Sequence, residues 1–380
     1  MADEKTILQY KGHPLMRKDN MIYYGSMADS HIVMLQILET KKVQDTDIAT
    51  KVSVELQLTD PNARAKDRIV KKSLAYHIIH DNIYTRKVMG VYNKLTHRYN
   101  FGFLYKHEAA YLQRKYNFDV VVAYHEGMTV EFASYFTNAK KITWFHCDPK
   151  VLGRNMIETY HSFYEMMDIV VGVSSVVKKS FLELMPHFPN EVKVIHNFLD
   201  TKFIRNKSNE SVVDVSQINS DIFSIISVGR STKVKQFEKI PVIMRQVVEQ
   251  GVENVCWYII AAGNECNDEI SKAIIDNGME HHVKMLGEKD NPYPCIKQSD
   301  LLISTSYSEA YPTVINEAQT LGVPVIANNY PSAKEIVSEG CGFVCPLENM
   351  PSLICKLVKD EDGIYSSAKQ NVAKSDYDNH

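Results

Sequence analysis

The stretch Ser-Glu-Ala-Tyr-Pro-Thr-Val-Ile-Asn-Glu-Ala, residues 308–318, places two carboxylates eight positions apart across the predicted start of a helix. The apolar run 301–305 before it predicts a buried strand, and residues 322–326 after it predict a helix end and a further strand. Glu309 therefore lies on a strand-to-helix loop, and Glu317 lies two turns into the helix on roughly the same side. Because N–H groups at a helix start favour an anion, two acids beside them suit a ligand with phosphates and hydroxyls, such as a sugar nucleotide.

This motif and its surroundings resemble a known family. The Glu-x7-Glu pattern, with Ala318 and Gly-Val-Pro-Val-Ile at 322–326, is similar to the donor-site signature of family-4 retaining glycosyltransferases of GT-B architecture, the group 1 glycosyl transferases of capsular and exopolysaccharide type. Upstream, Ser-Val-Gly-Arg at 227–230 with Lys235 resembles the diphosphate clamp of the same family. The resemblance covers about residues 100–365 and implies an α/β fold with two Rossmann-like domains.

The length and composition of the chain limit the possible function classes. A chain of 380 residues is too long for one ordinary core, so two domains are expected. Its 44% hydrophobic and 23% charged residues are typical of a globular protein, and a net charge of -3 gives no general attraction to nucleic acid. The apolar runs have the length of strands, and the N-terminus lacks the apolar core of a signal peptide. With seven cysteines in no close pairs, we expect a cytoplasmic protein with reduced thiols, no metal or other cofactor and no nucleic-acid partner.

The first 78 residues form a separate, β-rich segment. Residues 31–38 predict one strand, and the alternation of apolar and polar residues at 52–58 predicts another. The polar stretch 39–47 between them suggests an antiparallel hairpin or meander. The resemblance instead implies a parallel strand, a Gly-rich loop and a helix at this end, and no Gly-rich loop is found here. We therefore expect an incomplete N-terminal Rossmann-like domain after this segment.

Alternating strands and helices predict two doubly wound domains in the remainder. We expect the partial acceptor domain at 79–205, the nucleotide-sugar donor domain at 206–365, a linker within 200–221 and a C-terminal tail at 366–380. The predicted strands are 118–124, 141–146, 169–173 and 192–195, then 223–228, 255–261, 283–286, 301–304, 325–327 and 342–344; helices are predicted at 177–185, 237–250 and 311–320.

Four short segments follow predicted strands of the second domain. They are residues 229–230, 263–264, 287–288 and 309–310. Because ligands of open α/β sheets bind outside the carboxyl ends of the strands, these segments predict one shared crevice.

The resemblance implies a role for each residue around this crevice. Arg230 and Lys235 would stabilise the negative charge that develops on the leaving diphosphate, so a metal is not required. Glu317 would accept hydrogen bonds from the ribose hydroxyls, and Glu309 would contact the donor sugar near its anomeric carbon. The donor-binding set is Gly229, Arg230, Lys235, Gly263, Gly287, Ala310, Tyr311, Thr313 and Glu317, with the N–H groups of Ala310, Tyr311 and Thr313 opening the helix.

The first domain contributes further candidates. His146 follows the predicted strand 141–146, where the family often has His facing the donor sugar, and it is the second catalytic candidate beside Glu309. Asp148 and Glu126, each near a strand end, are candidates for the acceptor side. The resemblance implies retention of anomeric configuration by front-face attack, with the leaving phosphate taking the acceptor proton. No dedicated general base is assigned.

Structural alternatives accompany these assignments. Instead of a donor site, Glu309 could be a loop acid and Glu317 a solvated helix acid. Instead of a diphosphate clamp, Arg230 and Lys235 could be ordinary surface charges. Residues 125–127 form a structural turn as readily as an acceptor contact. The sequence departs from the family at Ala310, where Gly is usual, and a methyl there requires a negative φ.

Residues 83–117 are basic and aromatic, with Glu108 as their one acid. They predict either a solvated helix over an aromatic core or a peripheral contact with the inner face of the plasma membrane, which would suit a lipid-linked acceptor.

Two function hypotheses follow. The first is a retaining glycosyltransferase that moves a sugar from a nucleotide sugar, with UDP the usual nucleotide, to a glycan or lipid-linked acceptor in bacterial surface polysaccharide synthesis. The second is a degenerate GT-B protein that binds a nucleotide sugar or a partner glycosyltransferase without turnover. The four charged residues of the donor motif favour the first, and the unusual N-terminal segment favours the second.

Overall fold

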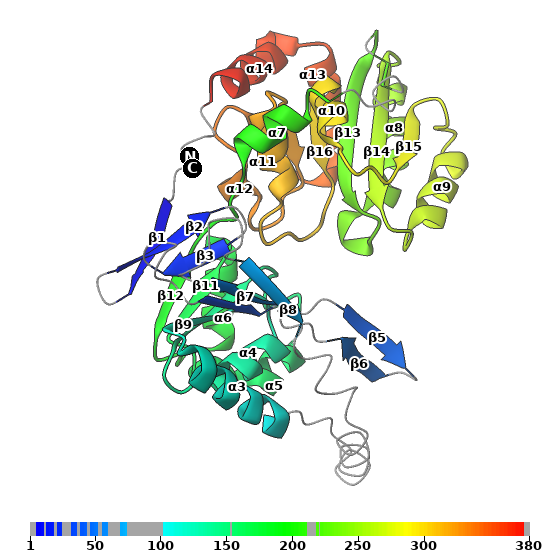
Figure 1. Cartoon of the computed structure of the whole chain (residues 1–380). Helices are drawn as coiled ribbons and strands as arrows, with labels where there is room; N and C mark the ends of the chain where they lie inside the picture. The colour runs from blue at the N-terminus through cyan, green and yellow to red at the C-terminus, as the bar shows by residue number, and fades with distance from the viewer. Residues whose placement is uncertain are drawn as a thin grey trace. The chain divides into compact units, whose positions relative to one another are not determined.

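The computed structural model describes strands within residues 5–73 by their backbone, and then residues 102–152, 154–210, 218–219 and 221–375 (Figure 1). The chain divides into two compact units, Met1–His196 and Asn197–His380. Each unit is built around a parallel sheet with helices, which confirms the predicted α/β class with two such sheets.

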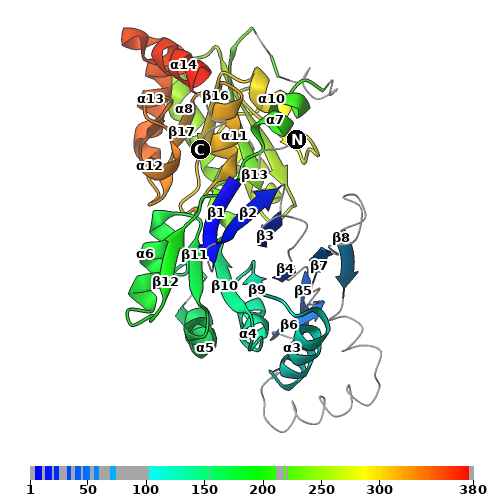
Figure 2. The same cartoon turned by 60° about the vertical axis from the view of Figure 1, so that its left-hand side comes forward.

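The parallel sheet of the first unit has the strand order β12-β11-β10-β9-β4 (Figure 2). Its strands are β4 (Ile32–Leu35), β9 (Val120–Ala123), β10 (Lys140–Phe145), β11 (Ile169–Gly172) and β12 (Glu191–Val194). The accompanying helices are α3 (Gly102–Tyr116), α4 (Met128–Ser134), α5 (Arg154–Glu165) and α6 (Ser175–Leu184). The continuous apolar runs of β9 and β11 are buried, as expected for parallel strands covered on both faces.

The pairing of the N-terminal strands differs from the prediction. The predicted strand 31–38 contains β4, but β4 pairs in parallel with β9, with Ile32 opposite Val120, rather than forming a hairpin with residues 52–58. The segment 39–47, predicted as a polar connection, contributes to a hairpin of β5 (Glu39–Val43) and β6 (Thr46–Lys51). The apolar run Ile-Val-Met-Leu of β4 suits a strand of a parallel sheet, here at its edge. A partner so distant in sequence as β9 is not visible in a local pattern.

Other strands of this segment form small antiparallel sheets. These are β1 (Lys5–Tyr10), β2 (His13–Lys18) and β3 (Met21–Tyr24) in one sheet, and β7 (Glu55–Thr59) with β8 (Ile69–Ser73) in another.

The sheet of the second unit has the order β15-β14-β13-β16-β17-β18. Its strands are β13 (Phe223–Arg230), β14 (Val255–Ala262), β15 (Val283–Gly287), β16 (Leu301–Ser304), β17 (Val325–Ala327) and β18 (Gly342–Val344). Numbered along the chain, this is the Rossmann order 3-2-1-4-5-6, in which chain progression reverses between the adjacent strands β13 and β16. The second unit therefore has its topological switch point at the ends of these two strands.

The helices of the second unit include α7 (Thr201–Lys207), α8 (Ile240–Glu249), α9 (Asn267–Asp276), α10 (Tyr293–Gln298), α11 (Thr313–Thr320), α12 (Ala333–Ile336), α13 (Met350–Val358) and α14 (Ile364–Lys374). Short 3-10 turns occur at Lys233–Lys235, Phe237–Lys239, Leu347–Asn349 and Glu361–Gly363.

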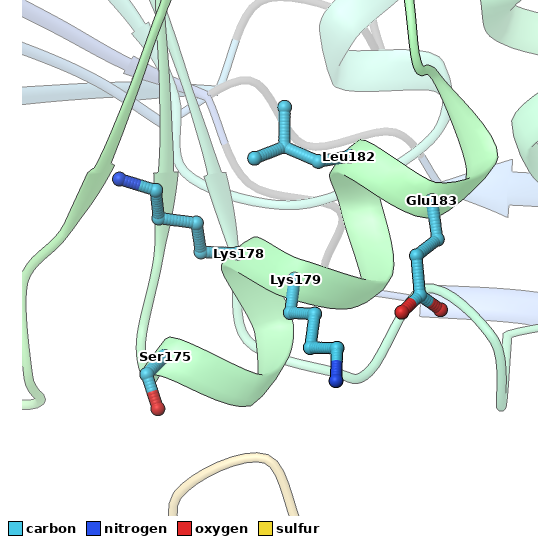
Figure 3. Close-up of a pocket in the computed structure, with 5 residues that line it drawn as sticks. All are labelled: Ser175, Lys178, Lys179, Leu182 and Glu183. Atoms are coloured by element: carbon cyan, nitrogen blue, oxygen red, sulfur yellow. The ribbon is translucent and has the colours of Figure 1, made fainter.

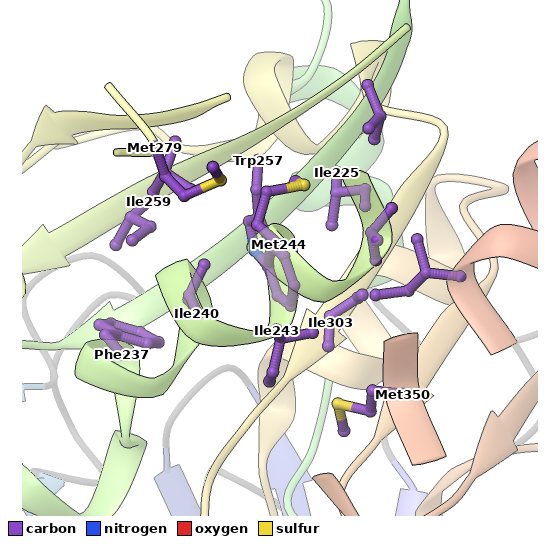
Figure 4. Close-up of a cluster of buried hydrophobic side chains, with 14 of the residues drawn as sticks. Ile225, Phe237, Ile240, Ile243, Met244, Trp257, Ile259, Met279, Ile303 and Met350 are labelled. Atoms are coloured by element: carbon purple, nitrogen blue, oxygen red, sulfur yellow. The ribbon is translucent and has the colours of Figure 1, made fainter. Parts of the chain in front are cut away.

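The helix α8 packs its apolar face on the sheet (Figure 4). Ile240, Ile243, Met244 and Val247 recur at the spacing of one helix face, and all four are buried in one cluster with Trp257 of β14. Each such side chain contributes about 1.5–3 kcal/mol when fully buried, so this face fixes α8 and the turn before it.

Three boundaries differ from the sequence predictions. The helix α7 occupies part of the stretch 200–221 that was predicted as a linker, because the Asp200 carboxylate caps it at the N–H of Phe203 and Ile204 is buried. The segment 366–380, predicted as a tail, is helical to Lys374, and Ala368 and Val372 are buried. The helix predicted at 311–320 begins at Thr313 instead, because Pro312 has an extended backbone.

Candidate functional site

The side chain of Lys235 reaches the loop after β16 from the turn after β13. Its Nζ lies 2.5 Å from Oε1 of Glu309, and the two side chains are only 18% and 16% exposed. The sequence separates these residues by 74 positions, and the neighbouring strands β13 and β16 bring them together at the switch point. An ion pair largely removed from water interacts far more strongly than an exposed one.

Glu309 is held by neighbours that the sequence prediction missed. Ser306 donates a hydrogen bond of 2.7 Å to the same Oε1 atom, and Ser332 donates one of 2.6 Å to the Glu309 carbonyl. Thr305 donates to the Lys235 carbonyl at 2.6 Å. All three hydroxyl-bearing residues are buried. Thr305 and Ser306 could have been identified from the polar run Ser-Thr-Ser at 304–306, which ends a buried apolar strand.

The glycine of the predicted clamp has a steric function. A Cβ atom on Gly229 would lie 3.0 Å from Cε of Lys235, so the lysine passes over the bare backbone. Arg230 ends β13 as an exposed residue, and among the described residues no ion pair joins it to Glu309. The structure thus joins Gly229, Lys235 and Glu309 in one cluster, with Arg230 beside it on the same strand.

The remaining strand-end glycines lie along the same edge of the sheet. Gly263 and Gly287, after β14 and at the end of β15, have φ of +77° and +74°, which a side-chain-bearing residue rarely adopts. The Gly263 N–H donates to Oε2 of Glu288 at 3.2 Å, linking the two loops. The four segments predicted to share a crevice follow strands that are neighbours in the sheet, in the order β15, β14, β13 and β16. Their carboxyl ends therefore lie at one edge, as predicted.

The helix α11 begins beside this cluster without a side-chain cap. Pro312 occupies the N-cap position, and no side-chain oxygen caps the first turn. The first N–H groups of a helix lack partners within the helix, so those of Thr313 and Val314 are available to an anion. Ala310 and Tyr311 lie before the helix, which corrects the prediction that their N–H groups open it. The backbone of Ala310 does not have a positive φ, so its methyl group is accommodated.

Glu317 lies in the second turn of α11 and is half-buried. Burial raises the pKa of this carboxyl above its usual value, opposed by a hydrogen bond with Thr313. Burial, followed by the charge of Glu317, also raises the pKa of Tyr293 to about 12. Tyr311 accepts a hydrogen bond of 3.1 Å from the Asn316 amide. Glu317 is therefore an acid in partly desolvated surroundings rather than a solvated helix residue.

The three other candidates lie in the first unit, and two of them, His146 and Glu126, are in contact. His146 follows β10 and is half-buried, with its ring 4.6 Å from that of Tyr124 between centroids. Asp148 accepts from the N–H of Lys150 at 3.0 Å within a turn. Glu126, expected on the acceptor side, has a side chain only 1% exposed and accepts hydrogen bonds from the backbone N–H groups of His146 and Cys147.

Further features lie outside these clusters. A shallow depression of about 430 Å³ on α6 is lined by Ser175, Lys178, Lys179, Leu182 and Glu183 (Figure 3). Within the described residues, no cluster of three or more His, Cys, Asp or Glu side chains is arranged to coordinate a metal ion. The described helices include none with both the length and the apolar composition to cross a membrane.

Comparison with known families supports the resemblance seen in the sequence. Residues 208–366 match the model of the family described as glycosyl transferases group 1. The similar proteins include an uncharacterized glycosyltransferase of Methanocaldococcus jannaschii, 24% identical over 232 residues, which are 57% of each chain. N-acetyl-alpha-D-glucosaminyl L-malate synthase of Bacillus anthracis is 24% identical over 52% of each chain. An uncharacterized 41.2 kDa protein in the cps region of Klebsiella pneumoniae is 31% identical over 40% of each chain. The chain thus spans about half the length of the curated relatives it matches.

The solved structures agree at the level of the fold. Anabaena HepE in complex with UDP has a TM-score of 0.58 and 20% identity, with 70% of this chain and 77% of that chain covered. At this identity the likeness establishes a shared fold.

Proposed function

Since the chain carries a domain of the group 1 glycosyl transferase family, we propose that it transfers a sugar from a nucleotide sugar to a hydroxyl acceptor with retention of anomeric configuration. The observation that carries this proposal is the largely buried pair of Lys235 and Glu309 at the switch point of the second unit, beside the uncapped start of α11. A cation, a carboxylate and free N–H donors at one sheet edge match a ligand with a diphosphate and a polyhydroxylated sugar.

The proposed reaction exchanges two bonds at the anomeric carbon. Its bond to the diphosphate oxygen breaks while a bond to the acceptor hydroxyl forms on the same face, and the acceptor proton passes to the leaving phosphate. Arg230, Lys235 and the N–H groups of α11 stabilise the negative charge on that phosphate. Glu309 holds the sugar and stabilises positive charge near the anomeric carbon, and Glu317 accepts from the ribose hydroxyls. His146 binds the sugar or the acceptor by a hydrogen bond.

For the donor we propose a UDP-sugar. The support is that HepE, which shares the fold, was crystallised with UDP. For the acceptor we propose a glycan or lipid-linked glycan of a bacterial surface polysaccharide, supported by the match to a protein in the cps region of Klebsiella pneumoniae.

A cytoplasmic protein acting on a lipid-linked acceptor would gain from a contact with the inner face of the membrane. The helix α3 exposes Lys106, His107, Arg114 and Lys115, and Tyr111 is 45% exposed. Its one acid, Glu108, is half-buried. This basic and aromatic face suits anionic lipid, whereas residues 83–101 of the same predicted segment lie outside the described residues. Sedimentation with vesicles containing anionic lipid should weaken in a Lys106→Glu, Arg114→Glu double variant, and unchanged sedimentation would remove this contact.

Calorimetry and turnover test the function together. UDP, GDP and their common sugar derivatives are titrated into the protein, and any ligand that binds is then tested for hydrolysis and transfer. We expect binding that is lost in Arg230→Ala and Glu317→Ala, and slow hydrolysis that is lost in Glu309→Ala. Binding without turnover would favour the non-catalytic alternative, and no binding to any nucleotide would refute both.

A further inference from the structure

The buried carboxylate of Glu126 connects the ends of two neighbouring strands in the first unit. Glu126 follows β9, and its Oε1 accepts hydrogen bonds of 2.6 Å from the His146 N–H and 2.9 Å from the Cys147 N–H, just after β10. The strands β9 and β10 are paired in parallel, with Ala123 opposite Thr143, so both ends lie at one edge. One carboxylate oxygen thus holds two consecutive amides of the loop that carries His146.

This carboxylate is itself firmly placed. Its side chain is 1% exposed, and its Oε2 atom, which is buried without a hydrogen-bond partner among the described residues, lies 3.1 Å from Nδ1 of His125. Thr129 donates to the His125 carbonyl, and Gly127, with φ of +81°, donates its N–H to the Tyr164 hydroxyl at 3.3 Å. The turn 125–127 is therefore anchored on both sides of Glu126.

Because Oε1 already accepts two hydrogen bonds and Oε2 is buried away from solvent, this carboxylate has little capacity to bind a substrate. Burying a charge is costly unless hydrogen bonds satisfy it, and charge-assisted bonds to backbone N–H groups are short and strong. Two bonds to consecutive amides restrict the backbone at His146 and hence the direction in which the imidazole leaves the sheet. The T-shaped contact between the rings of Tyr124 and His146, at an interplanar angle of 65°, fixes the same side chain from the β9 side.

We infer that Glu126 is a positioning residue, which orients His146 for the transfer reaction through the backbone of residues 146–147 and does not contact the acceptor. This inference rests on the proposed function, because it gives His146 a task that requires a fixed direction. It also replaces the sequence-based expectation that Glu126 lies on the acceptor side.

Steady-state kinetics with a double-mutant cycle tests this role. Glu126→Ala should lower kcat on the order of 10- to 100-fold with little change in the acceptor KM, because a small displacement of a reacting group has effects of this size. Glu126→Gln keeps an acceptor oxygen and should recover most of the rate. In a His146→Ala background the Glu126→Ala substitution should have no further effect, because residues that act through one another are not additive. The exposed Glu158→Gln on α5 serves as the matched control.

Two results would overturn the inference. Additive losses in the cycle would show that Glu126 acts independently of His146. A raised acceptor KM in Glu126→Gln at unchanged kcat would show that the carboxylate contacts the acceptor directly.

An amide measurement decides the inference even if no transfer activity is found. With selective 15N labelling of histidine and cysteine, the amide protons of His146 and Cys147 should resonate downfield in the native chain and shift upfield in Glu126→Ala, which removes the accepting oxygen. Assignments come from His146→Gln and Cys147→Ser. Unmoved resonances would refute the hydrogen bonds themselves. Moved resonances in an inactive protein would show that Glu126 positions the loop of His146 while refuting the proposed function.

Discussion

Gly229 lies directly against the side chain of Lys235, so that a methyl group on the glycine would stand 3.0 Å from Cε and 3.3 Å from Cδ of the lysine. Gly229 does not have a positive φ, so its use here is steric rather than conformational. It leaves room for the cation that reaches Glu309.

Gly229→Ala should therefore weaken donor binding without unfolding the second unit. The new methyl group forces the flexible lysine tail to move by a few tenths of an ångström or more, which we expect to lower nucleotide-sugar affinity about tenfold, the effect of one weakened charge-assisted hydrogen bond. Gly278→Ala is the matched control, because the positive φ of +65° there strains an alanine backbone but an added methyl group would meet no neighbouring atom. That variant should lose about 1 kcal/mol of stability and keep its affinity. Calorimetry and thermal unfolding measure both, and equal affinity in Gly229→Ala and the native chain would contradict the steric role.

Lys235→Met should have a larger effect on the same measurement. It removes the cation but keeps an apolar chain of similar length, so donor affinity should fall about 10- to 100-fold, the equivalent of 1.5–3 kcal/mol for a hydrogen bond to a charged group. Lys233→Met is the matched control two residues away, because Lys233 is exposed and pairs with Glu269. If both variants lose affinity equally, general charge rather than the pair with Glu309 determines binding.

Glu317 should make the stability of the second unit depend on pH. Burial raises its folded pKa above the unfolded value, so the folded state favours the protonated acid. Its contribution to stability is therefore greatest below the unfolded pKa and is lost as the pH rises through the folded value. Glu317→Gln should raise the unfolding temperature at pH 7 and change it little at acid pH, while donor binding falls. Thermal unfolding from pH 4 to pH 7.5 checks this, and a lower unfolding temperature for the variant at pH 7 would contradict it.

Ser227→Ala should destabilise the second unit without touching the site directly. The buried Ser227 hydroxyl accepts from Nε1 of Trp257 at 3.0 Å and donates to the Ile303 carbonyl at 2.5 Å, joining three strands. Its removal takes one partner from each of two buried groups, at a cost of about 1–3 kcal/mol in urea unfolding. Trp257→Phe should cost less stability in the Ser227→Ala background than in the native chain, because the indole N–H has already lost its partner there. Ser271→Ala, on an exposed position of α9, should stay within about 0.5 kcal/mol.

Local pattern was sufficient for most of the second unit. The strands β13 to β18, which lie between residues 223 and 344, each fall near their predicted positions. The reason is that a buried parallel strand is a short apolar run between polar turns. The residues of the donor motif could likewise be named, because their types and spacing are local. The small errors, such as a helix that begins at Thr313 rather than residue 311, arise from a single extended residue, Pro312.

The sequence by itself determined the two α/β domains and named Gly229, Lys235 and Glu309, which the structure brings together at the proposed donor site, because hydrophobic period and motif spacing are properties of neighbouring positions. Only the tertiary structure decided which distant groups touch: that β4 joins β9, that Ser306 and Ser332 hold Glu309, and that Glu126 is bonded to the backbone beside His146. The physical reason is that these contacts depend on strand order and on burial, which no local pattern encodes. A carboxylate at a strand end looks the same in sequence whether it faces a ligand or holds a neighbouring loop.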